Sequence, residues 1–89
     1  MADLQISADG KSVNPFQIKE HNSFPQVYLE TQGLTTIQYH RSTDGVTFTP
    51  VPEMVTFQSY LHDPLYGVKV GEFVKITSDV SILNAKIYW

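Results

Sequence analysis

Short turn signals interrupt this chain at intervals of roughly eight to twelve residues, and this spacing constrains the fold more than any other sequence feature. The signals are clusters of Gly, Asp, Asn, Ser and Pro, and the segments between them are rich in Val, Ile, Thr, Tyr and Phe. No segment of useful length shows the apolar period of an amphipathic helix. The pattern predicts an all-β protein of short antiparallel strands with no significant helix.

The candidate strands form one series without a linker or an internal repeat, so we expect a single domain over residues 1–89. Breaks are expected at residues 31–33, which end in Gly33, and at Pro50 and Pro52, which cannot donate to a strand ladder. The candidate ranges are 4–7, 12–18, 26–30, 34–41, 46–49, 53–61, 73–77 (preceded by 68–70) and 82–89. About seven or eight such strands predict one antiparallel β-sandwich, Ig-like or jelly-roll-like.

Two turns carry a specific prediction about the backbone. The first contains Asp9 and Gly10, and the second contains Ser42, Asp44 and Gly45. Gly adopts a positive φ at little cost, and an Asp side chain accepts hydrogen bonds from nearby backbone N–H groups. We expect a type I turn in which Gly45 occupies the left-handed bulge position.

Alternation of apolar and polar residues predicts which side chains enter the core. Ile37 and Tyr39 share one face of their strand, and Val74 and Ile76 share one face of a later strand. The same period places Leu83 on the core side of the last strand, together with Ala85, Ile87 and Trp89.

Charge and cysteine content exclude several classes of function. Six Lys and Arg against nine Asp and Glu give a net charge of −3, and no basic stripe suited to nucleic acid is present. The chain has no Cys, so disulfides, thiol nucleophiles and Cys-rich zinc sites are excluded. No run approaches the roughly 18 apolar residues of a membrane span, and the first residues do not resemble a signal peptide.

The sequence names no catalytic constellation. His21, His40 and His62 have no short metal-ligand spacing, and exposed or loop histidines account for them. The aspartates fall mostly in turns, where backbone capping explains them, although a calcium site built from turn oxygens stays open. The serines lack a nucleophile elbow and the glycines lack a phosphate loop. We therefore expect no enzyme activity, no cofactor and no metal.

Aromatic residues give the one positive functional signal. Five Phe, five Tyr and one Trp exceed what one buried sheet face needs, and charged residues are only 17% of the chain against roughly 25% on average. Outward aromatics would form a protein interface or a platform that stacks on sugars, whereas a register shift of one residue would bury them. The candidate interface residues are Tyr60, His62, Leu65, Tyr66, Phe73, Tyr88 and Trp89.

Residues 36–51 contain a strand that ends in Ser42-x-Asp44-Gly45, with the aromatic Phe48 three residues after the Gly. This pattern, together with residues 71–78 and the final strand, resembles small β-sandwich virion proteins of tailed bacteriophages. The resemblance covers about residues 34–89 and leaves the first third unmatched.

The resemblance implies a structural virion protein that decorates the capsid or serves as a tail accessory. Its partners would be other virion proteins and further copies of itself in a symmetric assembly, and it would be made in the host cytoplasm without a signal peptide. The absence of a catalytic constellation, the low charge and the spare aromatics favour the same function. A carbohydrate-binding module that uses the exposed aromatics is the alternative.

Overall fold

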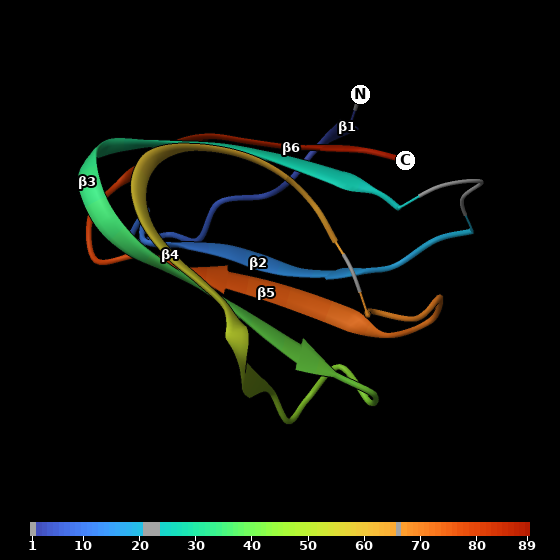
Figure 1. Cartoon of the computed structure of the whole chain (residues 1–89). Coiled ribbons are helices and arrows are strands. Elements are labelled where there is room, and N and C mark those ends of the chain that lie inside the picture. The colour runs from blue at the N-terminus through green and yellow to red at the C-terminus, as the bar shows by residue number, and fades with distance from the viewer. Residues whose placement is uncertain (1, 21–23, 66) are drawn as a thin grey trace.

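The computed structural model describes residues 2–20, 24–65 and 67–89, and these residues form strands without any helix (Figure 1). The expectation of an all-β protein is confirmed. The strands are β1 (Ala2–Asp3), β2 (Ser12–Gln17), β3 (Gln26–Ser42), β4 (Thr49–Pro64), β5 (Phe73–Thr77) and β6 (Ile82–Tyr88).

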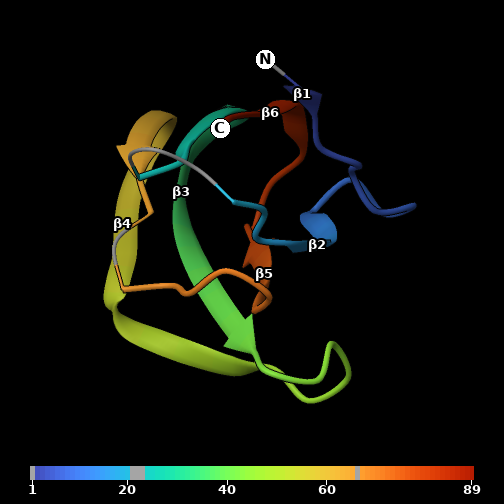
Figure 2. The same ribbon diagram turned by 90° about the vertical axis from the view of Figure 1, so that its right-hand side faces the viewer.

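All six described strands belong to one antiparallel sheet, and β3 lies at its centre. The first half of β3 pairs with β6 and its second half pairs with β5, while β4 runs along the opposite edge of β3. β1 extends the sheet beyond β6, and β2 extends it beyond β5. A bridge between Ile6 and Val13 joins the segment after β1 to β2, so the sheet curls into a half-barrel (Figure 2).

This arrangement corrects the expected number of strands and the expected sandwich. The predicted strands 26–30 and 34–41 are one continuous strand, β3, because a register shift between Glu30 and Thr35 takes up the residues between them. Gly33 does not have a positive φ, and the register shift shows that the backbone bulges between Glu30 and Thr35 while it continues along β4. The described chain therefore forms six strands in one curled sheet, and not seven or eight strands in two packed sheets.

The expected break at Pro50 and Pro52 is also wrong, because both prolines lie inside β4. Proline is tolerated there because β4 pairs with β3 alone among the described strands, and an edge strand can leave N–H positions unused. Residues 46–48, predicted as strand, lie outside the strands, and the Val46 side chain is 82% exposed.

The core lies inside the curl of the sheet, where alternate residues of β3 point inward. Ile37 and Tyr39 are buried together, and Val74 and Ile76 of β5 are buried beside them, which confirms the predicted faces. Leu83 is an exception with 53% exposure, because a register shift beside residue 82 turns it outward. The core cluster consists of Val13, Ile18, Val27, Leu29, Ile37, Tyr39, Leu61, Leu65, Val74, Ile76, Ile82, Ala85 and Ile87.

The turn after β3 is held by its own side chains. The Asp44 carboxylate accepts hydrogen bonds from the backbone N–H groups of Val46 (2.8 Å) and Thr47 (3.0 Å), and from the Ser42 hydroxyl (2.7 Å). Gly45 has a φ of 78°, in the left-handed region, and its N–H donates to the Ser42 hydroxyl oxygen at 2.9 Å. The earlier turn is similar, with Gly10 at a φ of 76° after Asp9, whose carboxylate accepts from the Lys11 N–H.

We expect Gly45→Val to lower the free energy of unfolding by about 1–3 kcal/mol, the usual cost of a non-glycine residue in the left-handed region. A Cβ at this position would also lie 3.2 Å from the Phe73 ring. Gly33→Val is the matched control, since a Cβ there has no neighbour within 4 Å and φ is not positive. Urea denaturation measures both variants, and equal stability of the two would contradict the described turn.

Asp44 gives a pH-dependent expectation for the same turn. The hydrogen bonds from the Thr47 and Val46 N–H groups and the Ser42 hydroxyl lower its pKa from 3.8 to about 2. A carboxyl whose pKa is lower in the folded state stabilises the fold above its unfolded pKa, and this contribution is lost as pH falls towards 2. Asp44→Asn should therefore reduce the loss of stability between about pH 4 and pH 2, measured by urea midpoints.

Asp79→Asn is the control for this pH series, because the exposed Asp79 carboxylate makes no hydrogen bond in the described part of the chain. We expect this control to keep the parent's acid profile. An Asp44→Asn variant with the same acid profile as the parent would show that the turn does not depend on the ionised carboxylate.

Candidate functional site

Cross-strand pairing gathers aromatic rings on the outer face of the sheet. Tyr28 of β3 lies opposite His62 of β4 and opposite Lys86 of β6, and directly opposite residues in an antiparallel pair point to the same face. The next row places Glu30 between Tyr60 and Asn84. We call Tyr28, Phe57, Tyr60, His62 and Tyr88 the outer patch.

Polar contacts hold the rings of the outer patch in place. The Tyr28 and His62 rings stack with centroids 3.9 Å apart and planes 22° apart. His62 Nε2 and Gln26 Oε1 are hydrogen-bonded, which fixes the orientation of the imidazole ring. Asn84 Nδ2 donates to Glu30 Oε1 at 3.0 Å beside Tyr60. The patch thus combines ordered aromatic rings with amide and carboxylate groups.

The outer patch presents large apolar side chains to solvent. The exposed fractions are 67% for Phe57, 60% for Tyr60 and 56% for Tyr88. Single exposed apolar residues are ordinary on protein surfaces, whereas several on neighbouring strands make this face the candidate interface.

The open edge of β4 adjoins the outer patch. β4 contains 16 residues, and within the described chain it pairs only with β3. Residues 54–61 in its middle contain no charged residue and no proline. Edge strands usually carry such residues because unpaired backbone N–H and C=O groups accept strands from other chains. Pro50, Pro52 and Pro64 protect only the two ends of this edge.

The predicted interface residues divide between this surface and the core. Tyr60, His62 and Tyr88 lie on the outer patch, the first two on β4 and the third on β6. Leu65 is only 1% exposed and belongs to the core cluster, because its N–H donates to the Pro25 carbonyl oxygen and draws it inward.

The remaining predicted interface residues are less exposed or lie outside the residues that the structure describes. Phe73 is half-buried and its ring packs over Gly45, so it supports the turn after β3. Trp89 is half-buried against the core cluster, with Lys19 Nζ 5.8 Å from its ring centroid. Tyr66 lies outside the described residues. Sequence reasoning missed Phe57, whose face depends on the register shift between residues 30 and 35.

Titratable groups elsewhere make structural contacts. Arg41 Nη2 donates to both carboxylate oxygens of Glu72 at 2.7 Å, and these hydrogen bonds lower the pKa of Glu72. His40 Nε2 lies 3.0 Å from Thr77 Oγ1, and burial lowers the pKa of His40, assisted by the charge of Lys75. Within the described ranges no three His, Cys, Asp or Glu side chains could hold a metal ion together. His21 lies outside those ranges.

No helix in the described part of the chain is long and apolar enough to cross a membrane. Comparison with protein-family models, with curated proteins and with solved structures finds no match to this chain. The proposed function therefore depends on the open edge of β4, on the outer patch and on the sequence resemblance.

Proposed function

We propose that this chain is a structural assembly protein without a catalytic role, and that it joins its neighbours through the open edge of β4 and the outer patch. The observation that carries the proposal is that β4 contains 16 residues and pairs along one edge only among the described strands. The sequence resemblance suggests the setting, a tailed-phage virion in which the protein decorates the capsid or serves as a tail accessory.

The edge of β4 supplies a backbone reason to associate. Its unpaired N–H and C=O groups form the hydrogen-bonding template that strand addition uses. The uncharged stretch 54–61 is long enough to accept a full strand of about five or six residues. The Ig-like or jelly-roll-like sandwich expected from the sequence is not needed for this mode of association, since one curled sheet already provides the edge.

The outer patch supplies the apolar area beside that edge. Tyr and Phe are enriched in the cores of protein interfaces, where Lys, Glu and Asp are depleted. Burying a side chain such as Phe57 completely contributes about 1.5–3 kcal/mol relative to its exposed state. Strand addition at β4 and burial of the outer patch therefore favour the same partner position.

A second copy of this chain is the partner that the charges of β4 favour. When two identical strands pair antiparallel about a two-fold axis, the segment around that axis faces itself, so like charges within the segment are brought close together. Residues 54–61 contain no charge, so this self-pairing meets no repulsion over its whole length. In a virion the same edge would also serve contacts with other structural proteins.

Sedimentation velocity over a range of protein concentrations tests the proposal. The parent should form dimers or larger oligomers, and Phe57→Lys should shift the distribution to monomer, because it puts a charge on the patch beside the edge. Val70→Lys is the matched control, since Val70 is also exposed but lies before β5, which among the described strands pairs with β2 and β3 and not with β4. Quantitative mass spectrometry of purified phage particles should find many copies of the protein per particle.

Other outcomes would contradict the assembly function or replace it. A parent that is monomeric at all concentrations and absent from particles would contradict the assembly function. If that monomer bound a glycan array and Tyr60→Ala abolished the binding, the carbohydrate-binding function would replace it. The observation favouring that second function is the placement of Tyr28 and Tyr60 beside Glu30 and Asn84, which combines ring stacking with hydrogen bonding.

A further inference from the structure

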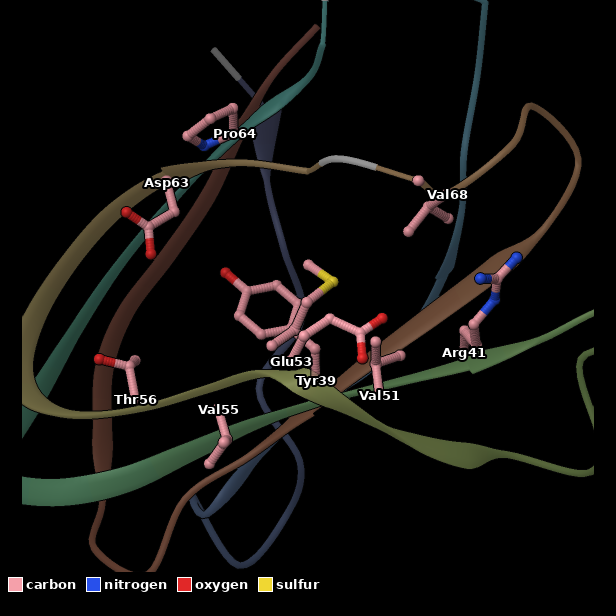
Figure 3. Close-up of a pocket in the computed structure, with 11 residues that line it drawn as sticks. Tyr39, Arg41, Val51, Glu53, Val55, Thr56, Asp63, Pro64 and Val68 are labelled. Carbon is pink, nitrogen blue, oxygen red and sulfur yellow. The ribbon is translucent and has the colours of Figure 1, made fainter.

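A pocket opens on the inner side of β4, on the face opposite to the outer patch. Its volume is about 450 Å³, within the range of sites that bind small molecules. Figure 3 shows Asp63 and Pro64 on one side and Val51 and Glu53 on the other, with the Tyr39 ring between them. Met54 and Val68 add to the apolar wall.

The Tyr39 hydroxyl is the least satisfied group of the pocket. Tyr39 is 4% exposed, and its hydroxyl has no hydrogen-bond partner among the described residues. A buried polar group without a partner destabilises a fold, and native proteins rarely keep one without a role. In Figure 3 this hydroxyl and the Asp63 carboxylate project into the same space.

The charges around the pocket are not balanced. The one cation that lines it, Arg41, is neutralised by Glu72, which accepts two hydrogen bonds from it. Glu53 and Asp63 form no ion pair with any described residue. Burial, together with the negative charge of Asp63, raises the pKa of Tyr39, so the phenol stays protonated and neutral. The pocket therefore carries excess negative charge over an apolar wall.

We propose that this pocket binds an organic cation, an ammonium group carried on an apolar body. The ammonium would donate hydrogen bonds to the Asp63 carboxylate and to the Tyr39 hydroxyl oxygen, while the apolar body packs against Val51, Met54 and Val68. Glu53 adds a second negative charge at the rim. The proposal is independent of the assembly function, because it uses the opposite face of β4.

NMR titration of the isotope-labelled full chain tests the charge selectivity at pH 7 and low salt. Benzylamine, benzyl alcohol and benzoate share one ring and differ in charge, so they separate the cationic requirement from ring burial. Benzylamine should give saturable amide shifts near residues 39, 54 and 63, with a Kd of about 1 mM, which is ordinary for so small a ligand. Benzyl alcohol should bind more weakly, and benzoate should not bind.

A further probe distinguishes two sources of the ammonium group. Nα-acetyl-lysine N-methylamide presents the ammonium as a protein side chain would, whereas benzylamine presents it on a small molecule. Tighter binding of the lysine derivative would identify a lysine of a partner protein as the ligand, and tighter binding of benzylamine would identify a free amine. Failure of both cations to bind, or equal binding of benzoate, would overturn the proposal.

Two variants locate the binding groups. Asp63→Asn should weaken benzylamine binding about tenfold, because a charge-assisted hydrogen bond is lost, and Asp79→Asn, on a turn remote in sequence, should leave it unchanged. Tyr39→Phe should also weaken binding, but its urea midpoint should equal or exceed the parent's, because it removes a polar group that has no partner. Unchanged benzylamine affinity in Asp63→Asn would contradict the assigned site.

Discussion

The pairing of β3 along both of its edges is the constraint on which the rest of the structure depends. This one strand of 17 residues pairs with β6 and β5 in succession on one edge and with β4 on the other. Register shifts in its pairing with β4 allow the sheet to bend, and the curl encloses the core.

The curl also decides where function can reside. Inward residues of β3 and β5 fill the core, so outward residues of the same strands stay at the surface. Bridging between Ile6 and Val13 ties the segment after β1 to β2, whereas the outer edge of β4 has no strand beside it among the described residues. One strand therefore presents three features at once, namely an unpaired edge, the outer patch and the wall of the inner pocket.

Sequence patterns predicted the local features of this fold well. Alternation placed Ile37 and Tyr39 inside, and Val74 and Ile76 likewise, because a two-residue period is a property of the strand itself. Breaks between strands were harder to predict. A cluster ending in Gly33 suits both a turn and a bulge, and the choice depends on whether β4 lies alongside, which is a long-range pairing that local sequence does not encode.

Some residues of the candidate site were predictable from the sequence, but their arrangement in space was not. Tyr60, His62 and Tyr88 were identified because aromatic residues were in excess, but their assembly into one patch depends on strand register. A shift in that register turns Leu83 outward, and the contact with Pro25 brings Leu65 into the core. The pocket could not be predicted from the sequence, since Tyr39 and Asp63 come together only through the curl of β4.

Hydrogen–deuterium exchange of the β4 amides, followed as a function of protein concentration, tests most directly whether this edge is the site of association. Amides that point away from β3 within residues 54–61 should exchange quickly in dilute protein and slow as the protein assembles, because a neighbouring strand then accepts their hydrogen bonds. Amides of the core strand β5 should show the same protection at every concentration. Exchange along residues 54–61 that stays fast while the protein oligomerises would place the interface elsewhere and contradict the account.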